Sequence, residues 1–185
     1  MNAQMTKVDP SIDSATFRRV LGHYPTGVSV ITSLDPAGAP VGLVVGSFTA
    51  VSLNPPLVAF FPDKGSTSWP RIERAGRFCV NILARDQQDL CKRFAAKGED
   101  KFAGLSYELS AAGSPVLKDI VAWIDCTVHA VHEAGDHFIV LGRVLELDIA
   151  KAGQPLLFFR GGYGSFLPYM GIGDDSPHHT HRPVE

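Results

Sequence analysis

Residues 63–68, read DKGSTS, combine the residue types that bind an anion. They precede a short helix predicted over 69–74, in which Pro70 suits the first turn and Gly76 ends the helix. The N–H groups at a helix start are free and carry a partial positive charge. With Lys64 and the serine and threonine hydroxyls, these groups would form a phosphate seat. An ordinary capped helix at the surface is an equally good interpretation of the same residues.

The strand predicted over 41–48 is the second candidate for chemistry. It pairs with 27–33 in a β-hairpin whose turn is Asp-Pro-Ala-Gly at 35–38. Gly42 and Gly46 lie within the strand, and glycine weakens a strand unless something must approach the backbone closely. A flat ligand is one such thing. On the residues alone, a plain hairpin whose glycines mark a bulge is the alternative.

The third candidate is the turn Gly135-Asp136-His137. A histidine at the start of a strand can be a ligand-binding group or simply part of a solvated turn, and Asp136 is expected to fix the turn by bonding its own backbone. No metal site is predicted, because His129 and His132 point to opposite faces of a strand and the histidines at 178–181 lie in a polar tail. No GxGxxG opens a helix after a strand, so any nicotinamide cofactor is not held in a Rossmann domain.

The elements that must position these residues are mostly strands. An apolar stripe at 17, 20, 21 and 24 predicts a helix capped by Asp13 or Ser14, and a second helix is predicted over 86–96. Further strands are predicted over 57–61, 77–83, 123–131 and 137–149. In 123–131 apolar residues alternate with Asp125, Thr127 and His129, which indicates a half-buried strand. About six strands without βαβ alternation predict a mainly β protein, an antiparallel barrel with two or three short helices.

Composition limits the partners and the compartment. The 185 residues, 45% hydrophobic and 19% charged, suit one domain, predicted over 13–168 between tails at 1–12 and 169–185. A formal net charge of -2 makes nucleic acid and anionic membranes poor partners. No apolar run could span a bilayer, and the first residues lack a signal-peptide core, so we expect a cytoplasmic protein. Three widely spaced cysteines are expected to be small buried residues in a reducing compartment: Cys79, Cys91 and Cys126.

Five segments together resemble the short-chain flavin reductase family. They are TGVSVIT at 26–32, GLVVGSFTAVSLNPPLV at 42–58, FCVNIL at 78–83, GDHFIVLGRV at 135–144 and PLLFFRGGY at 155–163. They occur in one order, and the match spans 17–163 without a large gap. The resemblance implies an FMN-binding split barrel that passes hydride from NADH or NADPH to FMN or FAD. It also implies a homodimer that supplies reduced flavin to a separate monooxygenase.

The resemblance also assigns roles to residues. The nicotinamide approaches the flavin beside His137, which is the catalytic residue expected. Eleven residues are expected to contact the cofactors: Thr26, Val44, Val45, Ser47, Ser52, Pro55, Lys64, Ser66, Ser68, Arg160 and Tyr163. Of these, Ser66 and Ser68 are the expected phosphate ligands, while Arg160 would face a phosphate of either cofactor.

This chain departs from the family pattern at two positions. Relatives commonly have a hydroxyl residue in place of Val44 and a serine in place of Gly46, so main-chain contacts to the ring remain but two side-chain contacts do not. These departures motivate one alternative, a flavin-binding module without turnover. A related split-barrel enzyme that uses another phosphorylated cofactor, such as pyridoxal phosphate, is another. The residues leave open FMN against FAD, NADH against NADPH, and bound against diffusible flavin.

Overall fold

The computed structural model of the protein describes residues 12–98 and 100–167. The predicted tails at 1–12 and 169–185 lie outside these residues, apart from Ile12, and so do the tail histidines. The helices in the described ranges are α1 (Ser14–Leu21), α2 (Trp69–Ala75) and α3 (Gln88–Ala95). The strands are β1 (Thr26–Gly27), β2 (Ser29–Leu34), β3 (Pro40–Val45), β4 (Thr49–Leu53), β5 (Pro56–Phe60), β6 (Arg77–Ile82), β7 (Tyr107–Leu109), β8 (Pro115–Leu117), β9 (Ala122–Ala134), β10 (His137–Ile149), β11 (Leu156–Phe159) and β12 (Gly162–Ser165).

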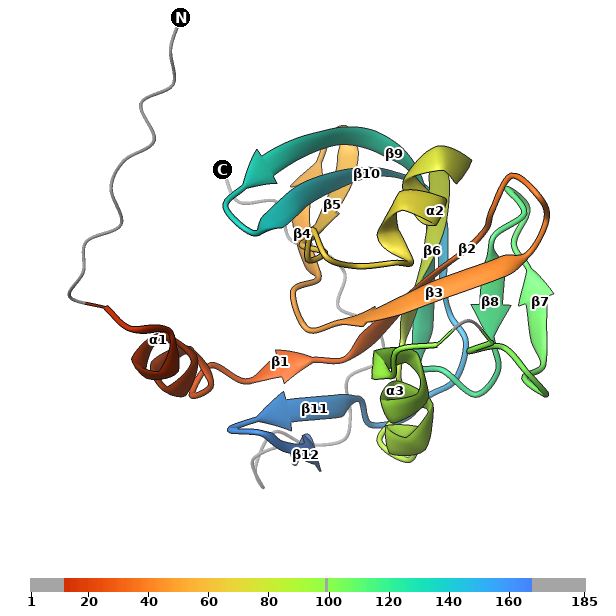
Figure 1. Ribbon diagram of the computed structural model, residues 1–185. Helices are drawn as coiled ribbons and strands as arrows, with labels where there is room; N and C mark the ends of the chain where they lie inside the picture. The colour runs from red at the N-terminus through yellow and green to blue at the C-terminus, as the bar shows by residue number, and fades with distance from the viewer. Residues whose placement is uncertain (1–11, 99, 168–185) are drawn as a thin grey trace, which may run out of the picture.

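Seven strands form one antiparallel sheet that curls into a barrel with an open side (Figure 1). Their order is β3-β2-β6-β9-β10-β5-β4, and each neighbouring pair is antiparallel. The six strands predicted from periodicity are confirmed as β2, β3, β5, β6, β9 and β10. The mainly β, antiparallel fold predicted from the sequence is therefore confirmed.

Six further strands were not predicted from periodicity. β1, β11 and β12 form a small separate sheet, and β7 pairs with β8 in the stretch between α3 and β9. β4 continues the large sheet at its edge. Most of these strands have two to four residues, too few for alternation to be recognised, and β1 pairs with β11 across almost the whole chain.

The barrel has two apolar cores because strand side chains alternate between its faces. On β2 and β3, Ile31 and Val45 face the first core, in which the rings of Phe60, Trp69 and Phe78 pack edge to face. Val28 and Val30 face the second core, which α3 covers through Cys91 and Phe94. The glycine-containing β3 thus lies between both cores. All three cysteines are buried free thiols, as expected.

One predicted side-chain position on β9 is wrong. Asp125 was expected on the solvent face, but it is fully buried, and its carboxylate has no hydrogen-bond partner among the described residues. Both faces of this part of β9 are covered, since Cys126 on one face belongs to the first core and Asp125 on the other lies opposite the equally buried Cys79 of β6. Burial, followed by the charge of Asp125, raises the pKa of the Cys79 thiol far above its usual range.

The predicted cap of α1 and end of α2 are confirmed, whereas α1 ends at Leu21, before Tyr24 of the predicted stripe, and α3 is shorter than the predicted range 86–96. Asp13 caps α1, since its Oδ1 accepts hydrogen bonds from the backbone N–H groups of Ala15 and Thr16 at 2.9 and 2.8 Å. Gly76 ends α2 with a φ of 68°, a left-handed conformation that glycine adopts without strain.

The apolar stripe of α1 is not buried within the chain: Phe17, Val20 and Leu21 are each more than half exposed. No helix within the described ranges is long and apolar enough to cross a lipid bilayer.

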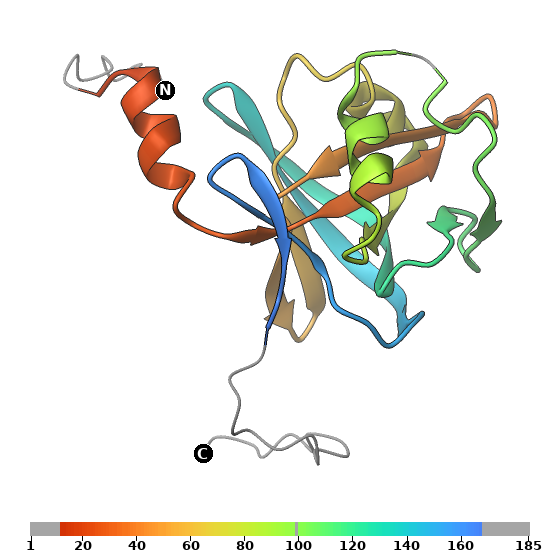
Figure 2. The same cartoon turned by 90° about the horizontal axis from the view of Figure 1, so that it is seen from below.

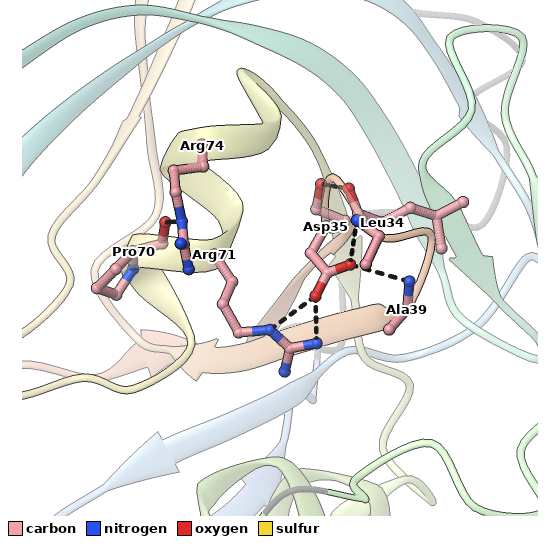
Figure 3. A network of polar contacts seen from close by, with 8 residues as sticks. Leu34, Asp35, Ala39, Pro70, Arg71 and Arg74 are labelled. Carbon is pink, nitrogen blue, oxygen red and sulfur yellow. Dashed lines mark hydrogen bonds and ion pairs between the residues drawn. The ribbon is translucent and has the colours of Figure 1, made fainter.

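An ion pair holds α2 against the β2–β3 turn (Figure 3). Arg71 donates from Nε and Nη2 to Asp35 Oδ2 at 3.0 and 2.7 Å, while Asp35 Oδ1 accepts from the N–H groups of Ala37 and Ala39. The Arg71 guanidinium lowers the pKa of the Asp35 carboxyl below its usual value. The carboxylate therefore stabilises the turn and positions the start of α2, which directly follows the predicted phosphate seat at 63–68.

Candidate active site

A cavity of about 1320 Å³ is lined by residues of α1 and of the β9–β10 turn, among others. Figure 2 shows these two segments on the same side of the molecule. The size of the cavity is ample for a cofactor, since ligand sites are commonly about 300–1,000 Å³. Five segments line it: the end of β3 with the next loop (43–47), the loop before α2 (61–68 without Lys64), the end of α3 with 95–98 and Lys101, the β9–β10 turn (134 and 137–139), and Phe17 and Leu21 of α1.

Backbone hydrogen bonds join the loop before α2 to the β9–β10 turn. Phe138 N donates to Pro62 O, and Lys64 N donates to Asp136 O, both at 2.9 Å. Asp63 and His137 form an isolated antiparallel bridge at the same place. Two segments far apart in sequence, each predicted separately to carry chemistry, are therefore held side by side on one wall of the cavity.

His137 lies on this wall and is oriented by its neighbour. Its Nδ1 lies 2.7 Å from Asp136 Oδ1. A carboxylate only accepts hydrogen bonds, so Nδ1 carries the proton and Nε2 stays free for a ligand. The Asp136 side chain was expected to bond its own backbone; its own N–H makes only a minor contribution, and His137 is its main partner. The hydrogen bond from His137 is the main reason that the pKa of Asp136 lies below its usual value.

The predicted phosphate seat is formed mainly by serines. Ser66 Oγ accepts a hydrogen bond from Trp69 N at 3.2 Å and so caps α2. Ser68 is buried, lines the cavity and makes no capping hydrogen bond, which leaves its hydroxyl available to a ligand. Lys64 does not line the cavity: its Nζ lies 2.9 Å from Glu133 Oε2 and over the ring of Phe138. Because α2 has only seven residues, hydroxyl and backbone groups matter here more than a helix dipole.

A second wall of the cavity is the end of β3. Val44, Val45, Gly46 and Ser47 all line the cavity, and Ser47 Oγ accepts from Phe61 N at 3.0 Å, which joins this wall to the loop before α2. A Cβ on Gly46 would come within 2.8 Å of Thr26 Oγ1. A side chain at this position would require the Thr26 side chain to shift, because Thr26 Oγ1 occupies the space into which a Cβ would project. A hydroxyl is still present at this position, from Thr26 rather than from a serine at 46.

Six predicted contacts do not line this cavity: Lys64, Thr26, whose hydroxyl lies beside Gly46, and the residues Ser52, Pro55, Arg160 and Tyr163. Ser52 and Pro55 belong to β4 and its turn into β5, and Arg160 and Tyr163 belong to the β11–β12 hairpin. The Tyr163 hydroxyl lies 3.3 Å from Cys91 Sγ, and this contact, more than burial, raises the pKa of Tyr163 to about 12. Within one copy of the chain, the structure brings together Val44, Val45, Ser47, Ser66, Ser68 and His137.

Several cavity residues were not predicted. Lys97 and Lys101 bring two positive charges to the end of α3 and the segment after it, and α1 contributes Phe17 and Leu21. Lysines near a helix end are common on protein surfaces, so nothing in the sequence distinguished these two. The α1 stripe predicted a helix, but its spacing does not say what the stripe contacts.

These groups suit binding and positioning rather than covalent attack. Among the described residues that line the cavity, none of the hydroxyls is hydrogen-bonded to His137, so no activated nucleophile is formed. No group of three His, Cys, Asp or Glu side chains able to hold a metal occurs in the described ranges. An open antiparallel barrel with an apolar cavity and a hydroxyl-lined end is the architecture of a split barrel that binds a phosphorylated cofactor.

Comparison with known proteins identifies the family. The model of the flavin reductase like domain matches residues 21–167. This range covers most of the chain, which therefore belongs to the flavin reductase-like family.

Relatives agree over most of their length. The chain is 61% identical over 159 residues to a flavin reductase of Pseudomonas putida, covering 86% of this chain and 94% of that protein. It is 49% identical over 158 residues to the reductase subunit HsaB of a flavin-dependent monooxygenase of Rhodococcus jostii, covering 85% and 80%.

Solved structures show the same fold. A nitrilotriacetate monooxygenase component B homologue from Mycobacterium thermoresistibile is 46% identical with a TM-score of 0.83, covering 93% of this chain and 97% of that one. The NADH:FAD oxidoreductase SgcE6 of Streptomyces globisporus is 35% identical with a TM-score of 0.80, covering 88% and 97%.

Proposed function

We propose that this protein is a flavin reductase that passes hydride from NADH or NADPH to FMN or FAD and supplies reduced flavin to a separate oxygenase. The observation that carries the proposal is the cavity: apolar at the end of β3, lined by hydroxyls before α2, and bordered by a histidine that Asp136 orients. In a chain of the flavin reductase-like family, these three features suit the ring, the phosphate and the approaching nicotinamide.

The names of the relatives support the finer parts of the proposal. One relative is a reductase subunit of a flavin-dependent monooxygenase, which favours a separate oxygenase partner here. One similar structure is an NADH:FAD oxidoreductase, which favours NADH as the hydride donor. We also propose the cytoplasm as the compartment, since a reducing environment keeps the three free cysteines reduced.

The residues present fit a flavin. The backbone of 44–47 and the side chains of Val44 and Val45 would contact the ring, with Thr26 beside Gly46, while Ser66 and Ser68 would donate to the phosphate. Bound flavin supplies the hydride-accepting ring, which no side chain can replace. Lys64 acts at longer range, because Glu133 already pairs with its ammonium group.

His137 would position the second substrate. Because Asp136 holds its Nδ1 proton, the imidazole keeps one tautomer and one orientation, and its free Nε2 accepts a hydrogen bond from a donor such as a carboxamide. Holding the donor carbon near the accepting ring converts an encounter of two molecules into a step within one complex. His137 therefore acts through orientation, with no proton transfer required of it.

A steady-state assay of nicotinamide oxidation tests the proposal. We expect the purified protein to oxidise NADH or NADPH only when FMN or FAD is present, because the hydride has no other acceptor in the cavity. If the protein binds flavin but oxidises neither nucleotide, the result supports a flavin-binding module without turnover instead. Absence of flavin-dependent oxidation with both nucleotides contradicts the proposed reductase.

We further propose that the protein forms a homodimer. Leu147 and Ile149 lie on one face of β10 and are 62% and 73% exposed, Leu145 at a β-bulge of the same strand is 53% exposed, and Leu53 at the end of β4 is 84% exposed. Monomers rarely leave such apolar surface in water. Ser52 and Pro55, on and beside β4, lie outside the cavity of their own chain, so a second copy is the route by which they would reach a flavin. Arg160 and Tyr163 would likewise contact a flavin bound in the second copy.

Sedimentation measures the assembly directly. We expect a particle with twice the mass of the chain, and Leu147→Lys should produce a monomer because it buries a charge in the proposed interface. The control is Leu109→Lys, which changes an exposed leucine of β7. A monomer in the unsubstituted protein, at concentrations at which the protein is active, contradicts the dimer.

A further inference from the structure

A second recess adjoins the main cavity. It has a volume of about 380 Å³ and is lined by 40–42, Thr67, Ser68, Arg71, Gly98, Lys101 and Phe102. Four of these residues, Thr67, Ser68, Gly98 and Lys101, line both spaces. They form a neck at which the main cavity and the recess meet, directly beside the proposed phosphate seat.

Lys101 is the cation of this neck. Its Nζ donates to Phe94 O at 2.8 Å, in the last turn of α3, and burial lowers its pKa. Within the described ranges no carboxylate lies at ion-pair distance from Lys101. Arg71 differs, because Asp35 pairs with its guanidinium. The ammonium group of Lys101 is partly buried and is held by a carbonyl alone. An anion beside it would therefore be stabilised more than an anion beside a cation that is already paired.

The recess combines two apolar side chains with polar groups at its neck. Val41 and Phe102 supply apolar walls, while Thr67 and Ser68 supply hydroxyls at the neck. Its volume lies at the lower end of the range for small-ligand sites, which suits part of a ligand rather than a whole cofactor. A ligand that continues from the phosphate at Ser66 and Ser68 would meet Lys101 next and the recess after it.

We propose that the recess takes the adenylate half of a dinucleotide, with Lys101 bound to its phosphate. The inference rests on the proposed function, since it needs the flavin phosphate at Ser66 and Ser68. FAD and NADH both carry an adenylate, whereas FMN and reduced nicotinamide mononucleotide lack it. The continuous path from the phosphate seat through the neck favours FAD as the ligand that uses the recess. The protein should accordingly prefer FAD to FMN.

The test compares each dinucleotide with its mononucleotide in Lys101→Met. We expect the dissociation constant for FAD to rise about tenfold, since one charge-assisted hydrogen bond to phosphate is lost, while that for FMN changes less than about twofold. A second arm measures KM for NADH and for reduced nicotinamide mononucleotide. A loss confined to NADH would support the recess as the adenylate site of the nicotinamide cofactor. Lys92→Met, at an exposed lysine of α3 paired with Asp89, is the matched control.

Two results would overturn the inference. One is an equal loss for FAD and FMN, which would mean that Lys101 serves the part common to both or only caps α3. The other is no loss for either dinucleotide. Thermal unfolding of Lys101→Met separates a folding defect from a binding defect, and Lys101→Arg, which keeps the charge, should restore most of the FAD affinity. Because binding is measured without turnover, a selective loss for FAD would stand even if the protein failed to oxidise NADH.

Discussion

Replacing His137 with alanine should lower kcat/KM for NADH about a hundredfold and leave the dissociation constant of FMN within about threefold. The imidazole belongs to the cavity wall at the β9–β10 turn, whereas the residues that would hold the ring belong to the end of β3. Its removal leaves that wall and the two serines before α2 in place. The loss should therefore appear in the use of the nicotinamide, measured by steady-state kinetics, and not in a flavin titration followed by fluorescence.

Two further variants sharpen this test. Asp136→Asn should give a smaller loss in the same parameter, because the imidazole remains but the carboxylate that selects its tautomer is gone. His132→Ala changes an exposed histidine of the same hairpin that does not line the cavity, and it should behave as the unsubstituted protein. If His137→Ala abolishes flavin binding, the residue belongs to the flavin site and the assignment to the nicotinamide is wrong.

Gly142→Ala should be strongly destabilising although it adds a single methyl group. A Cβ at this position of β10 would lie 2.4 Å from Phe78 Cζ, 3.1 Å from its Cε1 and 3.3 Å from Cys126 Cβ. Phe78 is fully buried, and its ring packs against Phe60 at a centroid distance of 5.1 Å, so it cannot turn away. Overpacking of this kind costs about 1–3 kcal/mol, which lowers Tm by roughly 2–4 °C for each kcal/mol in a chain of this size.

Differential scanning calorimetry of three variants isolates the cause. Gly164→Ala on β12 adds the same methyl group where no atom lies within 4 Å, and we expect Tm to change by less than about 1 °C. Phe78→Leu combined with Gly142→Ala should recover part of the stability lost by Gly142→Ala alone, because the smaller side chain makes room. Equal Tm values for Gly142→Ala and Gly164→Ala would contradict the steric explanation.

Local patterns in the sequence were sufficient for most of the regular elements. The caps at Asp13 and Gly76 and the turn at 35–38 depend on residues within one or two turns of chain, which is why they were found. The small sheet of β1, β11 and β12 was missed because strands of two to four residues show no period and their pairing joins distant parts of the chain. The burial of Asp125 was missed because alternation along β9 says nothing of what covers its second face.

The candidate site divides in the same way. The serines before α2, the end of β3 and His137 were each recognisable from nearby residues and from the family resemblance. Their meeting in one cavity depends on two backbone hydrogen bonds between the loop at 62–64 and the β9–β10 turn, and no local pattern contains these. Lys101 enters the neck through the packing of the segment after α3, which only the assembled chain specifies. Chain-local preferences thus set the elements and the candidate groups, whereas strand register and packing decide which groups share one ligand.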